Sequence, residues 1–296
     1  MTLSPTQLTV LLALTSAFLF ALSDQVAHRG LTTTDARSGS VVSVAVSALF
    51  FWLFAPWLLK DSFWWTNAAL IFAVIGIFRP ALSIYLAMLG IGYLGPTLAS
   101  AFSSTSPLWG SILAVITLGE AITPTIAIGT FSVVAGAIAA AYRPQGLLRN
   151  WPLWALLFPL GAAIVRASGH VATKYGYEEL PSPYFASLVS ITVSAVLGWA
   201  VFRLQGHRIR GGGDARRWLA AYKWFAISGT LNGMSIYTLN TALEQGSVVT
   251  VMPVASAGPV FTMLLGLFVF KRETITWRTV ASIGLVVCGV ILVIVR

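Results

Sequence analysis

The sequence predicts an all-α membrane protein in which ten transmembrane helices form two inverted five-helix repeats around a central cavity. Three observations predict this fold: the composition, the spacing of long apolar stretches, and an internal repeat. The 296 residues are 57% apolar and only 9% charged, whereas an ordinary soluble domain is roughly 25% charged. With a mean hydropathy of +0.84, the chain has room for about ten crossings of about 20 residues each, and not for a sizeable soluble domain.

Ten apolar stretches of spanning length are bounded by charged residues, Pro, Gly or polar clusters. In chain order they cover residues 7–28, 38–59, 67–90, 96–117, 123–141, 152–174, 183–203, 219–243, 247–270 and 275–295. Each is expected to be a helix, because backbone groups in lipid must pair within their own segment. The first stretch is expected to be a retained helix and not a signal peptide, because residues 1–7 carry no Lys or Arg.

An internal repeat links the third and fourth helices to the eighth and ninth. The third helix reads Leu-Ser-Ile-Tyr at 82–85, and the eighth reads Met-Ser-Ile-Tyr at 234–237. In both halves the serine precedes a proline, Pro107 or Pro259, by 24 positions. The same spacing in both halves indicates that this match is a duplication and not a chance tetrapeptide.

A second pair of landmarks extends the repeat to the end of each half. A Glu-x-Ile-Thr motif occurs at 120–123 and again at 273–276, and a glycine stands 16 positions after each Glu. We therefore expect residues 1–146 and 147–296 to be two copies of one five-helix unit. An odd number of helices inverts the second copy, an arrangement typical of secondary transporters with a site near the membrane midplane.

The basic residues are distributed unequally between the two predicted membrane faces. Connections after odd-numbered helices hold thirteen of them, and the opposite face holds three. The thirteen are Arg29, Arg37, Arg143, Arg149, Arg203, Arg208, Arg210, Arg216, Arg217, Lys223, Lys271, Arg272 and Arg278, and the three are Lys60, Lys174 and Arg296. By the positive-inside rule, both termini are expected on the side away from the cytoplasm. The net charge of +9 thus indicates basic loops at a membrane and not a nucleic-acid partner.

The sequence contains no pattern typical of an enzyme or of a cofactor site. Three His and nine acidic residues are scattered along the chain, without the clustered acids, metal-ligand spacing or activated nucleophile that catalysis needs. There is no phosphate-binding loop, so ATP-driven pumping by this chain is not expected. The single cysteine, Cys288, excludes an intramolecular disulfide and a cysteine-based metal site. We therefore expect no cofactor, no metal and no catalytic residue.

A charged side chain at membrane depth costs about 2.5 to 3.5 kcal/mol on insertion scales, so each one is a candidate functional residue. Arg79 lies in the third predicted helix, directly before Pro80. A bend is expected there, because proline removes a backbone donor. The Arg79 guanidinium suits a substrate carboxylate. The alternative is that Arg79 pairs with helix-end carbonyls or with an acidic neighbour.

The sixth predicted helix carries Arg166, His170 and Lys174 at intervals of four, which places them on one face. Such a stripe is expected to face a cavity or a partner acid and not lipid, although Lys174 is near enough to the helix end to snorkel. Asp24 in the first helix is the only carboxylate well inside a predicted span. It is a candidate for binding a substrate ammonium or a coupling proton, or for a structural ion pair with Arg166, His170 or Arg79.

Aromatic residues near the predicted cavity complete the candidate substrate site. Tyr85 and Tyr237 occupy equivalent positions of the repeat, and Trp109 follows the proline of the fourth helix by two residues. Their faces would stack on an apolar or aromatic side chain or on a cation. Asn232 adds a polar neighbour on the same helix as Tyr237.

Three prolines inside predicted helices, Pro80, Pro107 and Pro259, are candidate hinges. Broken helices leave backbone carbonyls available at the midplane, as transporter sites often do. The alternative is a kink whose carbonyls are satisfied by nearby Ser and Thr hydroxyls. Glu120 and Glu273, at equivalent junctions, are expected to cap helix starts, where a carboxylate complements the helix dipole.

Together these features resemble the EamA branch of the drug/metabolite transporter superfamily. The resemblance rests on the two five-helix halves, the proline in the fourth helix of each half, the Glu-x-Ile-Thr junctions and a Gly-rich fifth helix, and it is strongest at 104–138 and 253–291. It implies a ten-helix basket around a central cavity, alternating access and export of small metabolites. Among the members, the chain looks most like the amino-acid exporters, including those for aromatic amino acids. The family implies cytoplasmic termini, the opposite of what the loop charges predict.

The function expected from this resemblance and from the candidate residues is export of small zwitterionic metabolites, above all neutral or aromatic amino acids, across a bacterial-type inner membrane. The expected partners are a small-molecule substrate and the lipid bilayer. One chain holds both repeats, so a monomer is sufficient, and a homo-oligomer is also compatible. The alternatives are a multidrug, nucleotide-sugar or lipid translocator, and a membrane receptor that binds without translocating.

Overall fold

We analysed a computed structural model of the chain, which describes residues 4–30, 36–83, 86, 89–90, 93, 102, 104–141, 152–206, 215–269 and 277–294. Every regular element in these ranges is a helix. The first half contains α1 (Pro5–Gly30), α2 (Ala36–Leu58), the 3₁₀ turn η1 (Asp61–Trp65), α3 (Asn67–Ile77), the π-helical turn η2 (Phe78–Leu82), α6 (Ser106–Leu118) and α7 (Pro124–Ala141). The second half contains the 3₁₀ turn η4 (Leu153–Leu156), α8 (Leu157–Glu179), α9 (Pro183–Leu204), α10 (Ala215–Gln245), α11 (Val248–Ala255), α12 (Gly258–Phe268) and α13 (Trp277–Ile294).

All ten predicted helices correspond to helical segments of the described residues, and the fold class is confirmed. Five segments are individually long and apolar enough to cross a membrane: Pro5–Ala27, Ser38–Leu58, Leu153–Glu179, Pro183–Leu204 and Val248–Phe268. The helix α10 begins four residues before the predicted 219, because the first turn extends into the basic Ala215-Arg216-Arg217 segment. The predicted ninth helix is divided between α11 and α12.

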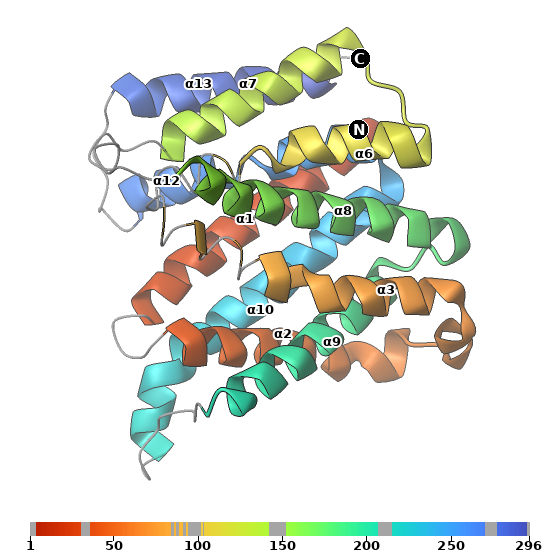
Figure 1. Cartoon of the computed structure of the whole chain (residues 1–296), viewed down its shortest axis with the longest axis vertical. Helices are drawn as coiled ribbons and strands as arrows, with labels where there is room; N and C mark the ends of the chain where they lie inside the picture. Colours follow the sequence, from red (N-terminus) through yellow and green to blue (C-terminus); the bar gives the residue numbers. More distant parts are fainter. Residues whose placement is uncertain are drawn as a thin grey trace.

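The helices of the two halves interleave and do not form separate bundles (Figure 1). The pair α7 and α13 lies at one end of the molecule, and α2 and α9 lie at the other, with α1, α10, α8 and α6 between them. Several contacts between the halves have counterparts: α1 packs on α10 as α8 packs on α3, and α2 packs on α10 as α9 packs on α3. Exchanging the halves preserves these pairs, which is the contact pattern of a pseudo-two-fold axis.

Reciprocal glycine contacts between α7 and α13 follow the register of the repeat. A Cβ on Gly129 would lie 2.7 Å from the Gly289 carbonyl oxygen, and a Cβ on Gly289 would lie 2.7 Å from that of Gly129. In this part of the repeat, equivalent residues are 153 positions apart, as Glu120 and Glu273 are. The repeat equivalent of Gly129 is therefore Ser282, and that of Gly289 is Gly136. A Cβ on Gly136 would indeed meet the Ser282 carbonyl oxygen at 2.9 Å. Small residues permit this close backbone approach.

A second symmetric pair joins the third helix of each half to the second helix of the other half. The Ser194 hydroxyl of α9 donates to the carbonyl of Gly76 in α3, and the Ser47 hydroxyl of α2 donates to that of Gly229 in α10, both at 2.6 Å. Gly76 and Gly229 are 153 positions apart, and Ser47 and Ser194 are 147 apart. The same hydrogen bond is thus built twice, once in each copy.

Helices four and nine break at the same position of the repeat. The α-helix resumes at Ser106 in the first half and at Gly258 in the second, 152 positions apart, each directly before the proline. In both, a turn precedes the restart, with the amide of Thr105 donating to Phe102 and that of Ala257 donating to Val254. The structure therefore bears out the predicted interruption of both helices near their centres.

Candidate substrate site

The π-helical turn η2 sets the position of Arg79. From Gly76 to Ser83 the chain advances seven residues, whereas the equivalent segment of α10, from Gly229 to Ser235, advances six. A π-turn accommodates a single inserted residue within an α-helix and is frequent at functional sites. At Arg79 the backbone leaves the helical conformation, with φ −117° and ψ 130°. This is the extended geometry that a residue before proline prefers.

Arg79 reaches from the first half of the chain to α8 in the second half. Its Nη1 lies 3.0 Å from Nδ1 of His170, a histidine that is only 6% exposed. Because a guanidinium only donates, Nδ1 must accept, so this ring is neutral with its proton on Nε2. The side chain of Arg79 lies over Gly169, where a Cβ would come within 2.5 Å of Arg79 Cδ. Any larger residue at 169 would displace the guanidinium.

Arg166 lies one helical turn before His170, on the same face of α8. Its Nε is buried without a hydrogen-bond partner, and its charge acts on Arg79. Among the residues that the structure describes, no carboxylate forms an ion pair with Arg79 or Arg166. The two guanidiniums therefore have no carboxylate partner in the described part of the bundle. We call Arg79, Arg166 and His170 the basic cluster.

Tyr177, which we did not predict, is a buried polar residue on the same helix as Arg166 and His170. It lies seven residues after His170 on the same face of α8 and is 6% exposed, and its hydroxyl has no hydrogen-bond partner. The hydroxyl interacts electrostatically first with Glu244 of α10, then with Arg79 and with Tyr237. The four-residue stripe from Arg166 leads to Lys174 and Glu178 and not to Tyr177, so the only signal in the sequence was its spacing of seven, or two helical turns, from His170.

The other aromatic and amide candidates lie on the neighbouring helices. Trp109 is half-buried on α6, where its Nε1 donates to the Thr105 hydroxyl at 3.2 Å. That part of α6 packs on α8 beside the basic cluster, because the Ser106 hydroxyl donates to the carbonyl of Ala163. Tyr237 is 41% exposed, and Asn232 is half-buried one and a half turns before it on α10.

The remaining candidates are placed differently or lie outside the described residues. The carboxylate-bearing side chain of Asp24 is exposed, and it forms no ion pair with Arg79, Arg166 or His170, all of which are described. That alternative for Asp24 is therefore wrong in this conformation. Tyr85 lies outside the described residues.

The three predicted hinges all coincide with helix irregularities. Pro80 lies in η2, Pro107 is the second residue of α6, and Pro259 is the second residue of α12. Hydroxyls satisfy the free carbonyls at the two later breaks: Thr105 donates to Phe102 at 2.6 Å, and Ser256 donates to Pro253 at 2.8 Å. The two later breaks are therefore kinks stabilised by hydroxyl hydrogen bonds. That the three prolines act as hinges stays a prediction.

Charged residues near the helix ends hold one end of the bundle together. The carboxylate of Glu120 accepts from the amides of Val248 and Val249, at 2.8 and 2.9 Å, and so caps α11. This confirms a capping role for Glu120, with the helix of the other half as its partner. Glu273, its repeat equivalent, lies outside the described residues. The carboxylate of Glu179 accepts from the amides at 67 and 68, at 3.0 and 2.9 Å, and caps α3.

Lys174 is a structural residue at this same end of the molecule. Its Nζ donates to the carbonyls of Leu243 and Gly246, at 2.8 and 2.9 Å, and thereby caps the end of α10. A cation is favourable at the C-terminus of a helix. Lys174 continues the four-residue spacing of Arg166 and His170, but its ammonium group binds the carbonyls at the end of α10 and is not part of the basic cluster.

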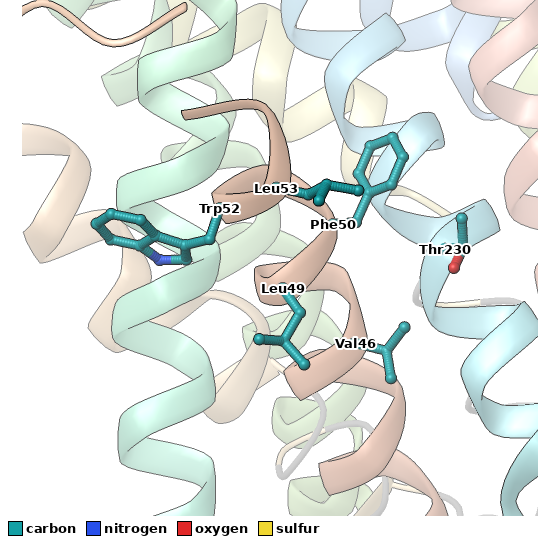
Figure 2. Close-up of a pocket in the computed structure, with 6 residues that line it drawn as sticks. All are labelled: Val46, Leu49, Phe50, Trp52, Leu53 and Thr230. Atoms are coloured by element: carbon teal, nitrogen blue, oxygen red, sulfur yellow. The ribbon is translucent and has the colours of Figure 1, made fainter. Parts of the chain in front are cut away.

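A surface hollow of about 500 Å³ lies between α2 and α10, away from the basic cluster. Figure 2 shows Val46 and Phe50 on the side of α2 that faces Thr230, and Trp52 pointing to the opposite side. No charged residue lines this hollow, whose lining residues are Val46, Leu49, Phe50, Trp52, Leu53 and Thr230. Exposed apolar side chains of this kind suit lipid contact, so we place the candidate substrate site at the basic cluster and not here.

Comparison with known proteins identifies the family. The model of the EamA-like transporter family matches residues 7–142 and 153–295, once in each half. No curated protein matches the chain. A solved structure described only as the crystal structure of a protein has a TM-score of 0.76 at 15% identity, over 96% of this chain and 95% of that chain, and shows the same fold. Because the family model covers both halves, the chain belongs to the EamA-like transporter family of multi-pass membrane transporters.

Proposed function

We propose that this protein is a secondary transporter that exports small zwitterionic metabolites, above all neutral or aromatic amino acids, across a bacterial-type inner membrane by alternating access. The observation that carries the proposal is the basic cluster between the two halves. Two guanidiniums lie there without a carboxylate partner among the described residues, and the Nε of Arg166 is buried and unpaired.

An unpaired buried charge costs several kcal/mol, and a partner that supplies the opposite charge recovers much of it. A substrate carboxylate fits this need, because a guanidinium binds a carboxylate through two parallel hydrogen bonds. The cluster also joins the two repeats, since Arg79 comes from η2 and His170 from α8. A carboxylate bound there would touch both halves, as a substrate that alternately faces the two sides must.

In this proposal, the other candidate residues bind the side chain and the ammonium group of the substrate. Trp109, Tyr85 and Tyr237 contact an apolar or aromatic side chain, with Asn232 as a polar neighbour. Asp24, exposed and without an ion pair to the basic cluster, takes the substrate ammonium or a coupling proton. Both repeats are present in one chain, so a single copy in a lipid bilayer is sufficient.

The test is counterflow in proteoliposomes, with one unlabelled amino acid inside at a time and a trace of the labelled one outside. We expect aromatic and branched neutral amino acids to drive uptake of their labelled forms, with and without a pH gradient. Saturable binding without any flux would instead support a receptor. No counterflow with any amino acid would overturn the proposal in favour of a drug, nucleotide-sugar or lipid cargo.

A further inference from the structure

We propose that Ser194 of α9 is a positioning residue of the substrate site, because its hydroxyl fixes the backbone from which Arg79 reaches the basic cluster. This inference rests on the proposed function and names a residue on which the same site depends. Ser194 is buried, with 3% of its surface exposed, and α9 packs on η2. Its hydroxyl contacts backbone carbonyls and not the basic cluster itself, so it acts on a substrate only through Arg79.

The proline after Arg79 creates the need for this hydroxyl. In an α-helix the carbonyl of Gly76 would accept from the amide at position 80, but Pro80 has no N–H. The carbonyl of Arg79 also leaves the helical pattern, because Arg79 has φ −117° and ψ 130°. Buried carbonyls without a donor are costly. The interruption at η2 therefore needs a donor from outside its own helix.

The Ser194 hydroxyl supplies this donor to both carbonyls. It donates to the Gly76 oxygen at 2.6 Å and to the Arg79 oxygen, so its proton is shared between them. Gly76 also lies against the backbone of α9, where a Cβ would come within 2.6 Å of the Ser190 carbonyl oxygen. The turn is thus attached to α9 through its backbone, while the Arg79 side chain extends to His170 on α8.

The equivalent hydroxyl in the other half shows what is specific to Ser194. Ser47 of α2 donates to the Gly229 carbonyl at 2.6 Å and to the Ser43 carbonyl of its own helix at 3.0 Å. The helix α10 is unbroken at this position, so the amide of Gly233 is available to the Gly229 carbonyl. Ser47 therefore adds a bond between two regular helices, whereas Ser194 replaces a donor that a proline removes.

The experiment compares Ser194→Ala with Ser47→Ala in the full chain. Each variant loses one buried hydroxyl that joins the two halves. Binding of L-phenylalanine is measured in detergent, together with the melting temperature. We expect Ser194→Ala to raise the Kd at least about fivefold, as the loss of one hydrogen bond of ordinary strength would. Ser47→Ala should leave the Kd unchanged, although both variants lower the melting temperature. Ser194→Thr keeps the hydroxyl and should restore the wild-type Kd.

A second probe shows whether the effect passes through Arg79. L-phenylalaninamide replaces the carboxylate by a neutral amide, so the wild type should bind it more weakly than L-phenylalanine, and Ser194→Ala should reduce this difference. An unchanged Kd for L-phenylalanine in Ser194→Ala, or an equal loss for both probes, would overturn the inference while the proposed function stands. If the wild type binds and transports neither L-phenylalanine nor any other amino acid, the proposed function falls, and this inference falls with it.

Discussion

Arg79 differs from the other basic residues because its backbone and its side chain are both placed by local constraints. The following proline holds the backbone extended, and Ser194 donates to the Arg79 carbonyl. The side chain then has room to cross to α8 only because residue 169 is glycine. These contacts orient the guanidinium before any substrate arrives, which reduces the entropy lost on binding.

We therefore predict that Arg79→Lys lowers amino-acid counterflow at least about tenfold, because lysine keeps the charge but loses the planar fork that matches a carboxylate. Membrane expression should stay at the wild-type level. Arg203→Lys is the control, since Arg203 is exposed and lies over the Trp199 ring, 5.7 Å from its centroid. Equal counterflow in Arg79→Lys and the wild type would remove Arg79 from the site.

A prediction for Arg166 follows from its unpaired Nε. Arg166→Met keeps an unbranched, flexible side chain and removes a buried charge that has no acidic partner among the described residues. Replacing buried charges by apolar groups of similar volume is often neutral or stabilising. We expect counterflow to fall while the melting temperature is unchanged or rises. A lower melting temperature with normal counterflow would show that Arg166 is a structural residue.

The basic cluster was predictable from the sequence only in part. The cost of a charge in lipid singled out Arg79 and Arg166, and the four-residue spacing placed Arg166 and His170 on one face. The bond between Arg79 and His170 was not predictable, because it joins residues 91 positions apart through the packing of η2 on α8. Tyr177 was missed for a similar reason, since burial of its hydroxyl depends on tertiary neighbours and not on local sequence.

At the scale of elements, the glycines of α7 and α13 decide how closely the fifth helices of the two halves approach. A Cβ on Gly129 would lie 2.7 Å from a backbone oxygen of α13, which cannot move aside as a side chain tip can. Gly284, also on α13, has open space around its Cβ position. We predict that Gly129→Ala lowers the free energy of unfolding by about 1–3 kcal/mol, as overpacking does, whereas Gly284→Ala leaves it unchanged or raises it. Thermal melts in detergent measure both, and equal melting temperatures would contradict the close approach.

The helices themselves were predicted from hydropathy to within a few residues, but the π-helical turn was not. Hydropathy reports where a chain is apolar, and one residue more or less in a span leaves that signal unchanged. The repeat contains the missing information, because seven steps from Gly76 to Ser83 correspond to six from Gly229 to Ser235. A comparison of the two halves at single-residue register would have located the irregularity at Arg79.

At the scale of the whole molecule, one end of the bundle is closed by two contacts in which a carboxylate of one half caps a helix of the other half. Glu120 of the first half caps α11 of the second, and Glu179 of the second caps α3 of the first. Lys174 lies in the electrostatic range of Glu120, Glu178 and Glu244, so these groups share one face of the protein. Because alternating access requires the two halves to separate on each side in turn, these two caps must break when this face opens.

We predict that Glu120→Gln combined with Glu179→Gln favours opening at this face. An amide keeps one acceptor oxygen but loses the charge and the second acceptor, at a cost of about 1 kcal/mol per cap. Thr173→Cys, buried on α8 at 4% exposure, is the reporter in a Cys288→Ala background. A membrane-impermeant thiol reagent applied from this side should label it several times faster in the double variant. Glu178→Gln is the control, since Glu178 is exposed beside the cap. If labelling of the double variant is as slow as that of the control, the two carboxylates stabilise their helices without holding the face closed.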